Sequence, residues 1–316
     1  MFNQWKKQIS FVEPYSSGSQ NPFDYDPYAD MPGVEISGPW HSKMAAHLKQ
    51  KGIRRVKLNA LKGSLAPDFE FLSELDHLKA LTLQLRDKNT GPVPLEALND
   101  LQQFRCTHVP FSAPLNFASL SNLRSCALAW GLHMRSVLSC ERLERLYLTG
   151  LKATESQGLA ALSSLKSLQL AHTSLASLAP IAGLTGMERL DLMVARKLES
   201  LEPLGELTKL RCLYLAEAHK ISSLEHLRPL KNLEALIMVD CGEIESLRPL
   251  AELKKLKAVC FAGAKTTIRD GDLSPLTGLE ELAMLMFGSR RHYSHKLIKK
   301  WNWANYDQPD TLLKAA

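Results

Sequence analysis

Apolar residues recur along the chain in a fixed order: one apolar residue, two variable residues, a second apolar residue, one variable residue and a third apolar residue. The order is clearest in LKSLQL (165–170), MERLDL (187–192) and LRCLYL (210–215). Alternation predicts a short strand whose first, fourth and sixth residues face a core. Each strand is followed by a second, less regular apolar run, so each unit predicts one strand and one return segment.

These units follow one another at nearly constant intervals of 20 to 25 residues. They open at Ile53, Leu78, Leu101, Leu123, Leu143, Leu165, Met187, Leu210, Leu233, Leu256 and Leu279. A fixed period of this length predicts a solenoid, in which each unit buries its apolar edge against its neighbours. The expected fold is therefore an α/β repeat array of about 11 units.

The second half of each unit also repeats, as in KLESLEPLGELTKL (197–210) and EIESLRPLAELKKL (243–256). With the strand pattern, this resembles the leucine-rich repeat family over residues 53–286, most closely its short bacterial and SDS22-like class. The resemblance implies a horseshoe-shaped solenoid with a parallel β-sheet on its concave face. The Asn that commonly follows the strand in this family is replaced here by Thr173, Ala195, Ala218, Cys241 and Ala264. We therefore expect an incomplete polar ladder at that turn.

The segments outside the repeats are expected to close the two ends of the stack. Residues 1–52 are interpreted as an N-terminal arm, irregular over 1–38, followed by a helix over 41–51 that ends at Gly52. Residues 287–316 are interpreted as a C-terminal cap with a short amphipathic helix over 294–303. Repeat stacks need such closing elements because their terminal units lack a neighbour.

The outward-facing positions of the strands carry the candidate site. The third, fifth and seventh residues of each unit face away from the core, and the eighth lies at the rim. They change from basic through aromatic to acidic along the chain. The residues expected to bind a partner are Arg105, His108, Trp130, Arg145, Tyr147, Gln169, His172, Arg189, Asp191, Tyr214, Glu217 and Asp240. Solvated strand faces carry assorted polar residues in any case, but exposed Trp and Tyr side chains are costly without a binding role.

Composition narrows the class of function. The net charge is only +6 over 316 residues, and Lys and Arg are interspersed with Asp and Glu, so nucleic-acid binding is not favoured. No apolar run is long enough for a signal peptide or a membrane span. The six cysteines form no C-x-x-C pair, which argues against a metal site and for a reducing compartment. We expect a cytoplasmic protein that is monomeric when unbound.

No catalytic motif is recognisable in the sequence. A Gly-rich phosphate loop, an H-E-x-x-H metal motif and a nucleophile elbow are all absent. His108 and His172 occupy equivalent positions three units apart, too distant to share a metal ion. Asp191 beside Arg189 indicates a charge pair rather than a catalytic dyad. The sequence therefore predicts a non-enzyme without a cofactor.

The leading hypothesis is a protein-binding scaffold that sequesters or inhibits a folded partner through its concave face. The specific form of this hypothesis is a bacterial immunity protein that neutralises a toxin domain. Two alternatives remain open: a regulatory subunit of a protein phosphatase, which the resemblance implies, and a secreted bacterial leucine-rich-repeat effector. Nucleic-acid binding through Arg55, Lys57, Arg105 and Arg145 ranks last.

Overall fold

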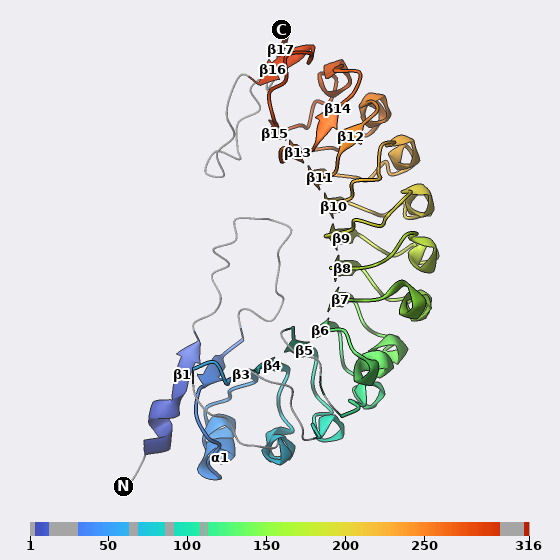
Figure 1. Cartoon of the computed structure of the whole chain (residues 1–316). Coiled ribbons are helices and arrows are strands. Elements are labelled where there is room, and N and C mark those ends of the chain that lie inside the picture. The colour runs from blue at the N-terminus through green and yellow to red at the C-terminus, as the bar shows by residue number, and fades with distance from the viewer. Residues whose placement is uncertain are drawn as a thin grey trace. The chain divides into compact units, whose positions relative to one another are not determined.

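The computed structural model describes residues 4–12, 31–62, 69–85, 92–107, 111, 113–297 and 313–315. They fall into two compact units, Met1–Thr149 (unit 1) and Gly150–Ala316 (unit 2). In both units, short parallel strands alternate with short 3-10 helices (Figure 1). Among the described residues, no helix is long and apolar enough to cross a membrane.

Unit 1 opens with a 3-10 helix, η1 (Gln4–Gln8), and a strand, β1 (Ile9–Val12), that pairs antiparallel with the next strand. The parallel ladder of unit 1 consists of β2 (Gly33–Ile36), β3 (Arg55–Asn59), β4 (Ala80–Gln84), β5 (Gln103–Cys106), β6 (Ser125–Ala129) and β7 (Arg145–Thr149). Its other 3-10 helices are η2 (Glu70–Leu75), η3 (Leu95–Ala97), η4 (Phe117–Ser119) and η5 (Leu132–Ser139).

The prediction of an irregular arm over residues 1–38 is wrong for the part that the structure describes. β2 lies against β3 in parallel register, with Val34 opposite Val56 and Ile36 opposite Leu58. Both Val34 and Ile36 are buried. The sheet of unit 1 thus begins before the first repeat, and β1 and β2 cover the strand that would otherwise form its edge.

The helix expected over residues 41–51 is confirmed as α1 (Lys43–Gln50), which buries Met44 and Leu48. Gly52 ends it with a left-handed φ of +64°. The Gly52 N–H donates to the Lys49 carbonyl at 3.1 Å, and the Ile53 N–H donates to the Leu48 carbonyl at 3.0 Å. This pair of bonds is the Schellman arrangement, in which glycine supplies the left-handed residue, and it leads the chain directly into β3.

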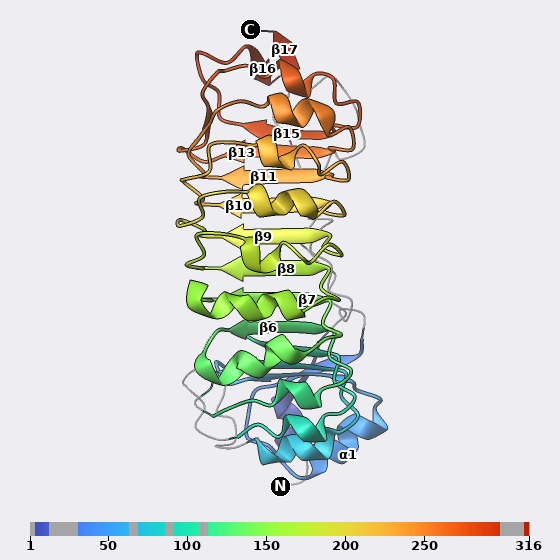
Figure 2. The ribbon, with the colours of Figure 1, turned by 90° about the vertical axis from the view of Figure 1, so that its right-hand side faces the viewer.

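Unit 2 contains a second parallel ladder, made of β8 (Ser167–Ala171), β9 (Arg189–Met193), β10 (Cys212–Ala216), β11 (Ala235–Val239), β13 (Ala258–Ala262) and β15 (Met284–Phe287). The 3-10 helices of unit 2 are η6 (Ala153–Ala161), η7 (Ala179–Ile181), η8 (Glu202–Glu206), η9 (Glu225–Leu227), η10 (Arg248–Glu252) and η11 (Ser274–Leu276). These helices lie one above another on the side of unit 2 opposite its strand face (Figure 2).

The strand register confirms the repeat spacing from β3 to β7 and from β8 to β13, and it corrects the last repeat. Ala258 is paired with Met284 and Cys260 with Met286, so the final strand belongs to a unit that opens at Leu282 rather than Leu279. The preceding turn contains β14 (Thr267–Ile268), which pairs in parallel with β12 (Glu243–Ile244) of the repeat before it. LEELAM and LAMLMF both fit the apolar pattern, so the sequence alone did not distinguish the two registers.

The inward positions form the core, as the alternation predicted. The fourth residues of four successive repeats in unit 2 are all 0 % exposed: Leu168, Leu190, Leu213 and Leu236. Burying each such side chain stabilises the fold by roughly 1.5–3 kcal/mol. Because every repeat has apolar residues at these positions, the core is continuous along each ladder. The residues on the opposite side of the strands can differ from repeat to repeat.

The turn after each strand shows the expected incomplete polar ladder. The Thr173 hydroxyl donates to the Leu151 carbonyl at 3.2 Å and accepts the Leu175 N–H at 3.3 Å. The Cys241 thiol donates to the Leu215 carbonyl at 3.3 Å. Ala195 and Ala218 occupy the equivalent positions and have no side-chain group that could form such a bond.

The C-terminal segment differs from the predicted amphipathic helix. Residues 295–297 form β16 (His295–Leu297), which pairs antiparallel with β17 (Leu313–Ala315). Residues 298–303 of the expected helix lie outside the described residues. Just before β16, the Tyr293 hydroxyl accepts the Ile268 N–H at 3.0 Å, and the Ser294 N–H donates to the Gly271 carbonyl at 2.8 Å. This segment is therefore hydrogen-bonded to the last turn of unit 2.

Candidate functional site

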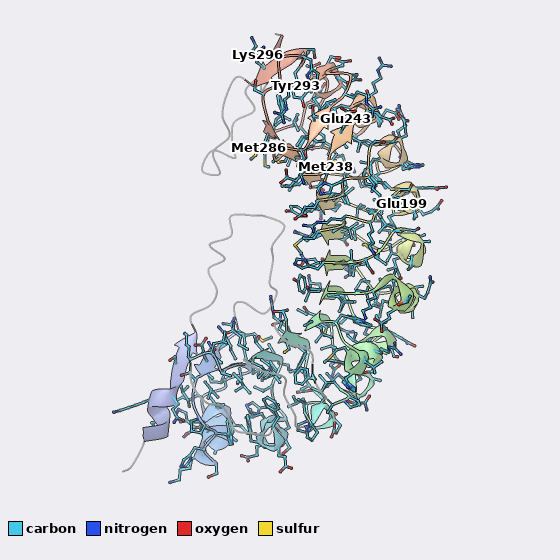
Figure 3. The ribbon with its side chains drawn as sticks, in the orientation of Figure 1. Glu199, Met238, Glu243, Met286, Tyr293 and Lys296 are labelled. Carbon is cyan, nitrogen blue, oxygen red and sulfur yellow. The ribbon has the colours of Figure 1, made fainter. Side chains whose placement is uncertain are left out.

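The outward side of the strands in unit 2 is mainly apolar from β9 onward. In Figure 1 these strands line the inner side of the curve of unit 2, and Figure 3 places Met286 on that side, opposite Glu199. Its partly exposed apolar side chains, which we call the apolar patch, are Met193, Val194, Tyr214, Ala216, Ile237, Val239, Ala262 and Met286. Tyr214 lies beside Ile237, and Ile237 beside Cys260, on neighbouring strands. The patch is therefore one continuous surface across the ladder.

The equivalent side of unit 1 is polar and basic. Its partly or fully exposed strand residues include Arg55, Lys57, Thr82, Gln84, Arg105, Ser125, Arg145, Tyr147 and Thr149. Lys57 Nζ lies 2.8 Å from the carboxylate of Glu35, and Lys62 Nζ lies 2.6 Å from it. Burial raises the pKa of Glu35, but the bonds from the two lysines outweigh burial and lower it overall. One basic residue of this face is thus already neutralised within unit 1.

A buried polar network marks the boundary of the apolar patch at β8 and β9. Arg189 Nη2 lies 2.8 Å from Asp191 Oδ2, and its Nε donates to Oδ1 and Oδ2 at 3.0 and 2.9 Å. Gln169 Nε2 also donates to Asp191 Oδ2, at 2.8 Å. Asp191 is only 4 % exposed, so the predicted charge pair is formed but it is buried rather than at the surface. A carboxylate held by three donor groups orients Arg189 and Gln169 rigidly.

Long charged side chains border the apolar patch along the starts of the strands, and they pair across repeats. Arg211 Nε lies 2.7 Å from Glu234, and Lys257 Nζ lies 3.3 Å from the same carboxylate. The row is extended by Glu188, 3.9 Å from Arg211, and by Glu281, 4.0 Å from Lys257. The hydrogen bond from Arg211, followed by that from Lys257, lowers the pKa of Glu234. The two cations and three carboxylates of this row are therefore paired within unit 2, with one carboxylate in excess.

The rim at the ends of the strands has an unusual backbone. The eighth residue of each repeat has a left-handed φ along this rim. Four of these residues are not glycine: His172 (+51°), Val194 (+59°), Glu217 (+54°) and Asp240 (+50°). The other two are Gly150 and Gly263. Left-handed angles are uncommon for residues other than glycine and are strained for a β-branched residue such as Val194. At Gly263, where φ is +90°, a Cβ would also displace the Asp240 carboxylate, so glycine is favoured there. The left-handed backbone of this rim was not evident from the sequence, because four of its six positions are not glycine.

The structure places the predicted site residues in two groups. Arg105, Arg145 and Tyr147 lie on the strand face of unit 1, whereas Gln169, His172, Arg189, Asp191, Tyr214, Glu217 and Asp240 lie on the strand face or rim of unit 2. His108 lies outside the described residues. The expectation that Trp130 is exposed is wrong, because its side chain is 9 % exposed and belongs to the core of unit 1. The apolar residues Met193, Ile237, Val239 and Met286 were not among the predicted site residues, because the prediction favoured aromatic and charged side chains at the outward positions.

The six cysteines are buried free thiols. Burial raises the pKa of Cys140 to about 11, of Cys260 to about 11 and of Cys212 to about 12. A thiol with such a pKa is protonated at neutral pH and is a poor nucleophile and a poor metal ligand. Among the described residues, no group of three or more His, Cys, Asp or Glu side chains could hold a metal ion.

Comparison with known proteins identifies the fold. No protein-family model and no curated protein sequence matches the chain. The solved internalin InlF from Listeria monocytogenes matches with a TM-score of 0.60 and 18 % identity, over 78 % of this chain and 71 % of InlF. Internalin C2 from the same organism matches at a TM-score of 0.44 and 21 % identity, over 78 % of this chain and 93 % of that one. The functional domain of InlJ, also from that organism, matches at 0.47 and 16 % identity, over 72 % and 52 %. The likeness to InlF and the parallel ladders show that this chain folds as a leucine-rich-repeat solenoid.

Proposed function

We propose that this chain is a non-catalytic protein-binding scaffold and that a folded partner docks on the apolar patch of unit 2. The observation that carries the proposal is the patch itself: partly exposed apolar side chains contributed by consecutive strands, with Tyr214, Ile237 and Met286 as the larger members. Contiguous apolar surface on a soluble protein is characteristic of an interaction site. Tyr214 is the best-suited anchor, because aromatic side chains often dominate the binding energy of an interface.

The rigid groups around the patch would set the orientation of the partner. Arg189 and Gln169 are fixed by the buried Asp191 carboxylate and are themselves partly exposed. His172 and Glu217 project from a rim whose backbone is held by hydrogen bonds from their N–H groups to Met193 and Val239. Such pre-ordered groups lose little conformational entropy on binding.

The role that best fits such a scaffold is sequestration or inhibition of the bound protein, and the specific candidate is neutralisation of a toxin domain. A broad docking face acts by occupancy, because it covers whatever surface of the partner it contacts. Co-expression with each toxin encoded by the same genome tests this role: the chain should restore growth against one of them. If no such toxin is neutralised, sequestration of a toxin is contradicted, while protein binding can still be measured separately.

The docking surface is tested with two variants of the full chain. Ile237→Asp places a charge in the apolar patch, and Thr82→Asp places the same charge at the equivalent fifth position of β4 in unit 1. A partner isolated by affinity capture should bind Ile237→Asp at least about 100-fold more weakly, a loss of about 3 kcal/mol. It should bind Thr82→Asp as it binds the unmodified chain. Equal loss in both variants, or loss only in Thr82→Asp, would contradict docking on unit 2.

A further inference from the structure

The apolar patch offers a partner little hydrogen bonding. Apart from the Tyr214 hydroxyl, the side chains of its eight members carry no hydroxyl, amide or charged group. The backbone groups of β10, β11 and β13 are already used, because each of these strands pairs with a strand on both sides. An extended segment laid on this surface would therefore leave its own N–H and C=O groups unsatisfied, which is costly once they are buried.

An α-helix does not have this difficulty, because its backbone groups bond to one another within the helix. We propose that the element of the partner that docks on the patch is an amphipathic α-helix, with its apolar stripe laid across β9–β15. This inference rests on the proposed function and specifies the partner further. The patch crosses the strands in the order β9, β10, β11, β13 and β15. With neighbouring strands about 4.8 Å apart, it is about 19 Å long, which a helix of about 13 residues spans.

The charges that border the patch indicate how strongly salt affects this binding. Glu234 is paired with both Arg211 and Lys257 along one border, and Arg196 is paired with Glu217 at the rim, with Nε 2.7 Å from the carboxylate. On the strand face, Arg189 is paired with Asp191. Charges that already neutralise one another attract a charged partner weakly. The helix is therefore bound by burial of apolar surface, and its affinity depends little on ionic strength.

Two synthetic peptides of about 14 residues and identical, net-neutral composition test the inference. In the first, leucines at i, i+3, i+4, i+7 and i+11 form one helical stripe. In the second, the same leucines alternate with polar residues, as in a strand. Fluorescence anisotropy with the full chain should give a Kd at least about tenfold lower for the first peptide. That Kd should change by less than about threefold between about 50 and 500 mM NaCl.

The variants Ile237→Gln and Met286→Gln should each weaken binding of the first peptide by about tenfold, whereas Thr82→Asn in unit 1 should leave it unchanged. Circular dichroism and the thermal midpoint establish that each variant is folded, and the two patch variants serve as checks on each other. The inference is overturned by equal or tighter binding of the alternating peptide, by a tenfold loss of affinity with salt, or by no effect of either patch variant.

Failure of the helix is distinguishable from failure of the docking surface. If the first peptide does not bind but the isolated partner is still lost in Ile237→Asp, the helix is wrong and the docking surface stands. If the partner also binds Ile237→Asp normally, both proposals are contradicted.

Discussion

The strand faces of the two units have similar backbones and opposite chemistry. In unit 1, the middle outward residues of β3, β4 and β5, at the fifth position of their repeats, are Lys57, Thr82 and Arg105. In unit 2, the equivalent residues of β10, β11 and β13 are Tyr214, Ile237 and Cys260. The inward residues of both ladders are leucine or similarly apolar and are buried. The repeat thus determines the backbone and the core, while the variable positions allow one unit to present a polar surface and the other an apolar one.

The difference also separates stability from binding. A polar strand face interacts well with water and needs no partner, whereas covering an apolar strand face lowers the free energy. Ion pairs that border the apolar face run between neighbouring repeats, as in Arg211 with Glu234, and so they connect the units of the stack as well. The effect of a substitution therefore shows whether a side chain stabilises its own unit or forms part of its surface.

The largest expected effect concerns the aromatic residues of unit 1. Trp130 is 9 % exposed, so Trp130→Ala should lower the free energy of unfolding by about 3–5 kcal/mol through lost burial and a cavity. Tyr147 is partly exposed, and Tyr147→Ala should cost about 1 kcal/mol. Urea unfolding of both variants measures the difference. If Trp130→Ala lowers the free energy of unfolding no more than Tyr147→Ala does, the tryptophan belongs to the surface of unit 1, and the two strand faces differ less in chemistry.

A smaller effect is expected at the left-handed rim of unit 2. A Cβ at Gly150 meets no atom within 4 Å, so Gly150→Ala isolates the strain of φ = +83° and should cost about 1 kcal/mol. Gly183 is the matched control: its Cβ is equally unobstructed and its φ is not left-handed, so Gly183→Ala should be neutral or stabilising by up to about 1 kcal/mol. Thermal unfolding compares them. Equal effects would mean that the rim is not strained and that its side chains are retained without cost.

An effect of similar size, confined to one pH range, is a pH dependence specific to unit 1. The folded-state pKa of Glu35 is lowered because its bonds with Lys57 and Lys62 outweigh burial. Its contribution to stability is therefore complete at neutral pH and is lost as the pH falls below about 4.3 and through the folded-state pKa. Glu35→Gln should lower stability at pH 7 by about 1 kcal/mol and flatten the acid limb of the stability curve. An acid limb unchanged in this variant would show that the ion pair on the unit 1 face does not contribute.

Sequence periodicity was sufficient for the core and insufficient for the surface. Leu168 and Leu190 were correctly assigned to the core because every repeat has an apolar residue at the same position, so an error in one repeat is corrected by the others. The strand that contains Val34 and Ile36 was missed although MPGVEI (31–36) fits the apolar pattern 22 residues before Ile53, because the Pro and Gly of this segment favoured an irregular arm. The burial of Trp130 and of Asp191 depends on side chains from adjacent repeats. The sequence pattern within one repeat does not contain this information. Ile237 was expected to face outward but was not taken as a site residue, because the prediction favoured aromatic and charged side chains. Met286 was missed because its position depends on the register of the last repeat, which the sequence left ambiguous.

Oxidative footprinting of the full chain with and without its partner shows which strand face the partner covers. Methionine and tyrosine side chains react readily with hydroxyl radicals, and they occur on both strand faces. Binding on the apolar patch should reduce oxidation of Met193, Tyr214 and Met286 and leave that of Tyr147 in unit 1 unchanged. Protection of Tyr147 with no protection of the three patch residues would contradict the account.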